Sequence, residues 1–412
     1  MKLYHSLLLC FCCTLSLISP VIISAGFASP VSASVISAEH NSSESSNDSG
    51  AYAPSISAPS SILMESSTGT ILYENNSHER LRPASVTKIM TLLLIFEALD
   101  SGSIQKSDVV TVSEHAAGMG GSQVYLEAGE TQTVDDLIKC ISIASANDAC
   151  VAMAEYISGS EEAFVAKMNE KAQSLGMSDT SFVNCCGLEA DGHLTSAYDI
   201  ALMSRELTVA HPDIFNYCTI WMDSIIHSTR KGDSEFGLTN TNKLIRFYSY
   251  ATGLKTGYTS QSKYCLSATA TRDSVDLIAV VMAEESAAIR NKDAVTLLDY
   301  GFAHCSVYCD EKPSALPALT VKKGTAETVP LSYASEFRYV LTDGTSPAAI
   351  EKSIELPEDI TTPVEKNAPV GKAVYTIGGK EIGSVDIVSA EAVPAATWGY
   401  QFLKSLHILL LK

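Results

Sequence analysis

Basic residues are scarce in this chain of 412 residues. It holds 28 Lys and Arg against 47 Asp and Glu, which gives a formal net charge of −19. No stretch of the chain is rich in Lys or Arg, and this absence argues against nucleic-acid binding through broad phosphate contacts. The hydrophobic fraction of 46% indicates a folded protein with a sizeable core and excludes a disordered chain.

Two common hydrolase signatures are absent as well. The chain has neither a Gly-x-Ser-x-Gly turn nor a His-Glu-x-x-His helix. His304, Cys305 and Cys309 cluster where the pattern predicts one helix, but they lack the second ligand pair that a structural zinc site needs. We expect no metal site and no cofactor.

Charged residues are also missing near the N-terminus, where Lys2 is the only one before Glu39. An apolar run follows Lys2 and ends in small residues, as is typical of a secretory signal peptide over residues 1–28. Cleavage after Ala33 fits nearly as well as cleavage after Ala28. An uncleaved membrane anchor is the alternative, but Pro20 interrupts the run. We therefore expect an exported protein.

Eight cysteines follow this segment, an even number that is compatible with disulfide bonds in an exported protein. A chain of this size does not need such bonds. Cys140, Cys150 and Cys265 lie in apolar runs, where a free thiol packs as a small hydrophobic group. Buried free thiols are the preferred interpretation.

Composition divides the rest of the chain into four parts. Residues 29–60 hold 12 Ser in 32 residues and predict a disordered linker. Residues 61–312 predict a mixed domain, with a strand pair near its start, a long helical region over 85–207, strands over 264–271 and 275–283, and a closing helix over 290–303. Short β-type runs over 316–394 predict a small all-β domain.

The last part, residues 397–412, predicts an amphipathic helix. Trp398, Phe402 and Leu406 recur every four residues, with Lys404 and Lys412 beside them. The helix is too short to cross a bilayer, so we expect it to lie on a membrane surface. Docking on the protein's own surface is the alternative.

Ser85 and Lys88 form the first candidate catalytic motif. They precede a strongly apolar run over 89–99, which predicts that Ser85 stands at a helix N-terminus with Lys88 one turn away. A serine becomes nucleophilic when a neighbouring base accepts its proton, and lysine can be that base. Alone the motif is weak, because a helix cap with a solvated lysine has the same sequence.

Two further motifs follow in order. Ser145 and Asn147 are polar residues in an otherwise apolar helical region, which indicates a site that receives their side chains. Lys255, Thr256 and Gly257 precede predicted strands, where small residues let a ligand approach a strand edge and lysine can bind a carboxylate. The ordered trio is a much stronger signal than any one motif.

With these motifs the chain resembles the low-molecular-mass penicillin-binding proteins, the serine-type D-alanyl-D-alanine carboxypeptidases of peptidase family S11. The resemblance extends from about Ala58 to the tail and includes other matching positions: Gly120-Gly121-Ser122, Gly187-Leu188, His193, Asp199, Asn240-Thr241-Asn242 and Arg290. It implies an α+β fold of the penicillin-binding type. Such a fold has a five-stranded antiparallel sheet flanked by helices, a helical lobe, and a small C-terminal all-β domain.

The same resemblance implies a role for each motif residue. Ser85 would be the acylated nucleophile, Lys88 its proton acceptor, and Ser145 the relay to the leaving D-alanine. The substrate would be held by Asn147, Lys255, Thr256, Gly257, Tyr258 and Arg290, and the backbone N–H groups of Ser85 and Tyr258 would form the oxyanion hole. Some members have an arginine where this chain has Thr241, and a histidine where it has Tyr258, which leaves open whether a second cation assists Lys255.

The resemblance implies removal of the terminal D-alanine from the stem pentapeptide of peptidoglycan, and inhibition by β-lactams. The export signal and the tail helix together predict a cell-envelope enzyme held peripherally on the outer face of the cytoplasmic membrane. A β-lactamase is one alternative, but no Glu between Asn147 and Lys255 has an Asn four residues later. A catalytically silent peptidoglycan-binding scaffold is the other.

Overall fold

The computed structural model describes residues 53–229, 232–310, 315–342 and 344–410. The predicted signal peptide and residues 29–52 of the predicted linker lie outside the described residues. The end of that linker overlaps the first strand, because β1 begins at Ser60. Just before it, Ser57 N and Ala58 N donate to Asp293 Oδ2 at 2.6 and 3.0 Å, so the chain is already fixed at these residues.

The central sheet has five strands in the order β2-β1-β9-β8-β7, and all four pairings are antiparallel. The strands are β1 (Ser60–Glu65), β2 (Ile71–Asn75), β7 (Ala251–Thr259), β8 (Lys263–Arg272) and β9 (Val275–Glu284). The predicted hairpin near the start of the domain and the two predicted strands before residue 284 are confirmed. Because β7 lies at the edge of the sheet, one of its sides is open to other elements.

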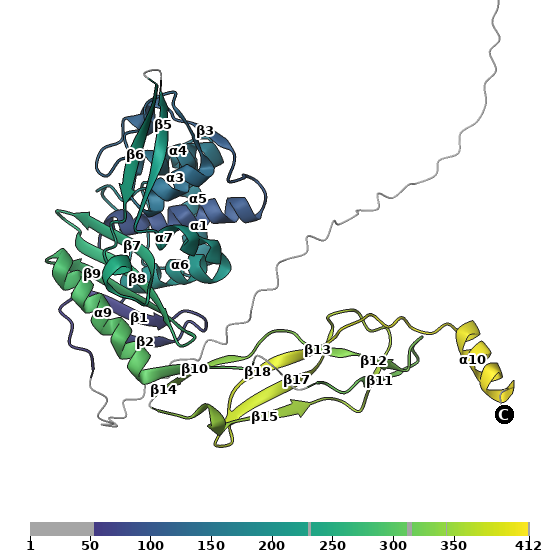
Figure 1. Ribbon diagram of the computed structural model, residues 1–412. Helices are drawn as coiled ribbons and strands as arrows, with labels where there is room; N and C mark the ends of the chain where they lie inside the picture. The colour runs from purple at the N-terminus through teal and green to yellow at the C-terminus, as the bar shows by residue number, and fades with distance from the viewer. Residues whose placement is uncertain (1–52, 230–231, 311–314, 343, 411–412) are drawn as a thin grey trace, which may run out of the picture. The chain divides into compact units, whose positions relative to one another are not determined.

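Alternate residues of β9 pack against different layers, as the period of two in a strand requires. Ile278, Val280 and Met282 join the core of the helical lobe, whereas the residues between them pack on the other face. That face is covered by α9 (Ala287–His304), as Figure 1 shows. The closing helix is therefore confirmed, with Ser286 as its N-cap. The expectation that Cys305 and Cys309 share this helix is wrong, because they bound strand β10.

The helical lobe is built around α1 (Lys88–Asp100), which is buried on nearly every side. Its sequence is apolar all round, and such a helix belongs in the centre of a domain. Four helices of nine to fourteen residues accompany it: α3 (Val134–Ser142), α4 (Asn147–Ser158), α5 (Glu161–Ser174) and α6 (Ala197–Ala210). Shorter elements connect them: η1 (Ala84–Thr87), β3 (Val109–Thr111), α2 (Glu114–Ala117), β4 (Thr131–Thr133), η2 (Pro212–Ile214), α7 (Phe215–Cys218) and α8 (Leu244–Phe247).

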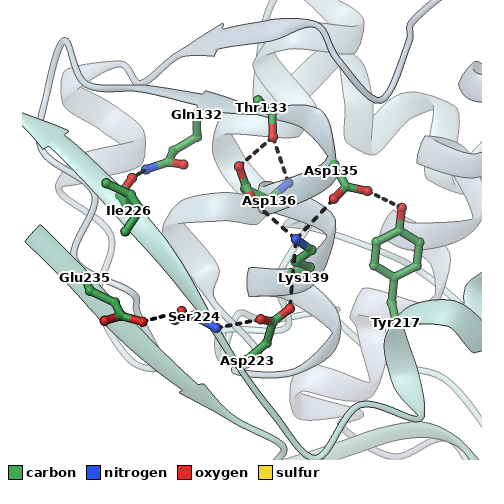
Figure 2. Close-up of polar contacts among 10 residues, drawn as sticks. All are labelled: Gln132, Thr133, Asp135, Asp136, Lys139, Tyr217, Asp223, Ser224, Ile226 and Glu235. Atoms are coloured by element: carbon green, nitrogen blue, oxygen red, sulfur yellow. Dashed lines mark hydrogen bonds and ion pairs between the residues drawn. The ribbon is translucent and has the colours of Figure 1, made fainter. Parts of the chain in front are cut away.

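A β-hairpin, β5 (Met222–Thr229) and β6 (Gly232–Thr239), precedes α8 and β7 in the sequence, and the sequence did not predict it. Polar contacts tie it to the lobe, as Figure 2 shows. Gln132 Nε2 donates to Ile226 O at 2.8 Å. Lys139 of α3 lies 3.9 Å from the Asp223 carboxylate and also pairs with two carboxylates of its own helix. The hairpin is thus attached to the elements that lead to the second motif.

The C-terminal part is all-β, as predicted, and forms three small sheets. Its strands are β10 (Cys305–Cys309), β11 (Leu319–Lys322), β12 (Thr328–Val329), β13 (Leu331–Tyr333), β14 (Arg338–Thr342), β15 (Ile350–Glu355), β16 (Asp359–Thr361), β17 (Pro369–Ile377) and β18 (Lys380–Ser389). One core is centred on the stacked rings of Phe337 and Tyr375, whose centroids are 3.7 Å apart.

The predicted tail helix is present as α10 (Trp398–Leu410). Trp398 and Leu410 expose 81% and 75% of their surfaces, so much of the helix's apolar area is uncovered. Within the described residues, no helix combines the length and the apolar character that crossing a membrane requires.

The eight cysteines among the described residues are free. Cys140, Cys150 and Cys265 are buried, as predicted from their apolar surroundings.

Candidate active site

Ser85 stands in η1, a 3₁₀ helix of one turn that lies immediately before α1. The turn runs directly into α1, whose first residue is Lys88, so Ser85 stands at a helix N-terminus with Lys88 one turn away, as predicted. The turn is followed by a helix that is locked in the core, so the backbone of both residues is fixed. Ser85 is partly exposed, whereas Lys88 is fully buried.

The ammonium group of Lys88 has three oxygen neighbours. Lys88 Nζ donates to Ser85 Oγ at 3.0 Å, to Asn147 Oδ1 at 2.6 Å and to the backbone O of Cys186 at 2.6 Å. The amide of Asn147 has a defined orientation, since its Nδ2 donates to Gly120 O at 2.7 Å. Asn147 Oδ1 and Cys186 O can therefore only accept hydrogen bonds from Lys88.

This arrangement orients the neutral form of Lys88. A neutral amine has two N–H bonds and one lone pair. Because Asn147 and Cys186 present acceptors alone, they take the two N–H bonds, and the lone pair points toward Ser85 Oγ. This is the geometry in which lysine can accept the hydroxyl proton of the serine.

Ser145 lies in the short break between α3 and α4, where the two apolar helices are interrupted. Its backbone is left-handed, with φ +62°, and its side chain is 3% exposed. Such strain in a residue other than glycine is uncommon and often occurs at functional sites. Asn147 N donates to Ser122 O at 2.7 Å, so the loop at Gly120–Ser122 borders the same break.

The third motif runs along the edge strand β7, directly beside η1. A Cβ added to Gly257 would lie 2.6 Å from Pro83 O and 3.1 Å from the Cβ of Ala84. Only glycine allows this approach, so the backbone of Gly257 passes close to the turn that carries Ser85. Thr256 Oγ1 donates to Thr241 Oγ1 at 2.8 Å.

A backbone contact joins the second and third motifs. Thr241 N donates to Ile143 O, in the break between α3 and α4, at 3.1 Å. Because Thr241 also contacts Thr256, all three motifs meet in one place although they are far apart in the sequence.

Three basic side chains are buried at this meeting point: Lys88, Lys255 and Arg290, with exposed fractions of 0, 1 and 5%. Lys255 Nζ donates to Thr256 O at 3.0 Å. Burial, followed by the charges of Lys88 and Arg290, holds the pKa of Lys255 well below its usual range. Burial also lowers the pKa of Arg290. Within the described parts of the chain, no carboxylate forms an ion pair with any of the three, so this place favours an anionic ligand.

Tyr258, the next residue of β7, exposes 56% of its surface. Its ring packs against that of Tyr264 with the centroids 4.3 Å apart, and the Arg290 guanidinium lies 5.9 Å from the Tyr264 ring centroid. Arg290 also donates to the side chain of Asn291. Tyr258 and Arg290 are therefore connected through one intervening ring.

Sequence reasoning missed one group that contacts Lys88, the backbone carbonyl of Cys186. A carbonyl leaves no mark in the sequence, so no signal could have revealed it. His193, singled out only through the resemblance, supports the turn that carries Ser85. Val183 N donates to His193 Nδ1 at 3.0 Å, so the other ring nitrogen, Nε2, donates to Thr87 Oγ1 at 2.8 Å. Burial, with smaller contributions from two cations, lowers the pKa of His193 to about 4.

The chain is similar to known proteins along most of its length. The sequence model of the D-alanyl-D-alanine carboxypeptidase family matches residues 47–286, and that of the penicillin-binding protein 5 C-terminal domain matches residues 311–395. The carboxypeptidase DacF of Bacillus subtilis is 42% identical over 340 residues, which cover 82% of this chain and 86% of DacF. Penicillin-binding protein 5 of Haemophilus influenzae superposes with a TM-score of 0.70 at 29% identity, over 84% of this chain and 100% of that structure. Mutants of the Streptomyces K15 DD-transpeptidase cover 61% of this chain with a TM-score of 0.57.

Proposed function

The chain belongs to the family of serine-type D-alanyl-D-alanine carboxypeptidases, and we propose that Ser85 carries the acyl group in its reaction. The enzyme removes the terminal D-alanine from peptidoglycan stem pentapeptides, and β-lactams bind to the same fold. The observation that carries the proposal is the position of Lys88 Nζ. It lies 3.0 Å from Ser85 Oγ and also contacts Asn147 Oδ1 and Cys186 O, two oxygens that can only accept hydrogen bonds.

In the acylation step, the lone pair of neutral Lys88 takes the proton of Ser85 Oγ. The oxygen attacks the carbonyl carbon of the penultimate D-alanine, and the π electron pair moves to the carbonyl oxygen. When the tetrahedral intermediate collapses, the C=O bond re-forms, the C–N bond breaks, and the leaving D-alanine nitrogen takes the proton of Lys88 through Ser145, which returns Lys88 to its neutral form. Water then hydrolyses the acyl-serine and restores Ser85.

The developing oxyanion is stabilised by the backbone N–H groups of Ser85 and Tyr258. Two observations support this assignment. Gly257 brings the backbone of β7 against η1, and Tyr258 directly follows Gly257 in the strand. A donor from each element can therefore reach one oxygen.

Lys255, Thr256 and Arg290 bind the free carboxylate of the substrate, and Asn147 holds its amide. Both cations are almost fully buried without a carboxylate partner among the described residues, and a substrate carboxylate would supply that partner. Some family members have a second cation, an arginine, at the position of Thr241. In this chain Arg290 provides the second cation instead. Because this site needs a free carboxylate on the substrate, it favours removal of a terminal residue over cleavage within a peptide chain.

The enzyme acts outside the cytoplasm in the cell envelope, after export by the N-terminal segment. The exposed apolar residues of α10 hold it on the surface of the membrane. The last lysine, Lys412, lies outside the described residues.

Release of D-alanine from a pentapeptide ending in D-Ala-D-Ala tests this function. We expect release by the wild-type protein and by Lys167→Ala, a control at an exposed lysine of α5. Lys88→Ala should lower the rate by at least a hundredfold, because the general base is lost. Wild-type rates in Lys88→Ala would assign the base to another residue, and no release by the wild type would favour a silent scaffold.

A further inference from the structure

The carbonyl of Cys186 is held in place by one neighbouring side chain. Asn184 Oδ1 accepts hydrogen bonds from three successive backbone N–H groups: those of Cys186 (3.2 Å), Gly187 (2.7 Å) and Leu188 (3.1 Å). Asn184 Nδ2 donates to Leu188 O at 2.8 Å, which fixes the amide orientation. One asparagine thus shapes the whole turn over residues 184–188.

The turn is also pressed against the residues that carry Ser85. Gly187 has φ +85°, and a Cβ at this position would lie 1.9 Å from Ala84 O. Thr91 Oγ1 of α1 donates to Cys185 O at 2.5 Å. The carbonyl of Cys186 therefore belongs to a turn that packs against η1 and α1. The shape of this turn depends on Asn184.

We propose that Asn184 is a positioning residue for Lys88, acting through the backbone carbonyl of Cys186. The inference rests on the proposed function, in which Lys88 is the general base. While the carbonyl holds one N–H of the neutral amine, the lone pair faces Ser85 Oγ and can accept its proton. If the carbonyl turns away, that N–H is free to donate to Ser85 Oγ, and the lone pair leaves the reaction path.

Substitutions at Asn184 separate this role from a merely structural one. Asn184→Ala removes the acceptor of three N–H groups, whereas Asn184→Asp keeps it. Asn169→Ala is the matched control, because the Asn169 side chain makes three hydrogen bonds with backbone groups, against four for Asn184, and none of the three reaches the turn over residues 184–188. The kcat and KM for D-alanine release, together with the thermal midpoint, are measured for each variant.

We expect kcat to fall at least tenfold in Asn184→Ala with KM within twofold of wild type, since binding residues are untouched. Asn184→Asp should keep kcat within threefold, and Asn169→Ala within twofold even if its thermal midpoint falls as far as that of Asn184→Ala. If Asn184→Ala does not fold, Asn184→Gln, which displaces the acceptor by one methylene, should show the same loss of kcat.

The inference is overturned if Asn184→Ala and Asn169→Ala have equal kcat, or if Asn184→Asp is as impaired as Asn184→Ala. Either result counts against the inference only when the wild-type enzyme releases D-alanine in the same assay. An inactive wild type that penicillin does not acylate would overturn the proposed function itself.

Discussion

Lys88 and Asn147 are joined by a hydrogen bond of 2.6 Å between Nζ and Oδ1, although 59 positions separate them in the sequence. Each residue is the first of its helix, Lys88 in α1 and Asn147 in α4. The bond therefore connects the starts of two helices that are packed in one core. Such helices cannot move apart without disrupting that core, so the relative positions of the Lys88 amine and the Asn147 amide are built into the fold.

The carboxylate-binding role of Lys255 predicts a substrate-dependent effect. Lys255→Met should slow release from a peptide with a free terminal carboxylate far more than cleavage of the amidated peptide. The expected difference corresponds to about 2–4 kcal/mol of transition-state binding, because the ion pair would be desolvated. The measurement is kcat/KM for the two peptides. Equal losses would show that Lys255 serves another purpose, such as acting on Lys88.

The close approach of β7 to η1 predicts that Gly257 tolerates no side chain. In Gly257→Ala the added Cβ meets Pro83 O, so we expect a loss of about 1–3 kcal/mol in stability and a slower acylation by penicillin. Gly237→Ala in β6 is the control, because its Cβ meets nothing within 4 Å. Urea unfolding and labelling rates measure both effects. Identical behaviour of the two variants would mean that β7 does not constrain η1.

The buried imidazole of His193 predicts a pH dependence of stability. The unfolded imidazole binds a proton below about pH 6.5, whereas the folded one, with its pKa lowered to about 4, does so only in stronger acid. The unfolded state therefore binds more protons between these values, and stability falls as the pH falls. The expected loss is about 3 kcal/mol between pH 7 and pH 4.

His193→Gln isolates this contribution, because glutamine keeps a donor for Thr87 but does not titrate. Urea unfolding of both proteins across this pH range gives the comparison. The account fails if wild type and His193→Gln lose the same stability on acidification.

The tail helix predicts where the enzyme is found. Deletion of residues 397–412 should move the mature protein from vesicles containing anionic lipid to the soluble fraction, while activity on a soluble peptide is kept. High salt or alkaline carbonate should extract the full-length mature protein in the same way. A truncated protein that still sediments with the vesicles would place the anchor elsewhere, with an uncleaved N-terminal segment as the next explanation.

The strands over 264–271 and 275–283 and the closing helix could be predicted from their apolar patterns, whereas the helices of the lobe could be predicted only as one helical region over 85–207. The run over 275–283 is apolar on both sides, and the structure buries one side under α9 and the other under the helical lobe. The hairpin β5–β6 gave no such signal. Most of its residues are exposed or half-buried, and polar contacts such as that between Lys139 and Asp223 hold it in place.

The motif residues could be selected from the sequence as candidates for the site, but their arrangement could not be predicted. Ser85 proved to lie in a 3₁₀ turn, because α1 begins only at Lys88. Nothing in the sequence marks the Cys186 carbonyl as a neighbour of Lys88, since a backbone group is the same in every residue. The three-dimensional fold alone brings it within 2.6 Å of Nζ.

The most direct test of the account is the position of the penicillin adduct. After reaction with a fluorescent penicillin, the protein is digested and its peptides are analysed by mass spectrometry. We expect one covalent adduct on Ser85, stable enough to isolate, and no labelling of Ser85→Ala. An adduct on another residue, or labelling of Ser85→Ala at the wild-type level, would contradict the assignment of Ser85 as the nucleophile.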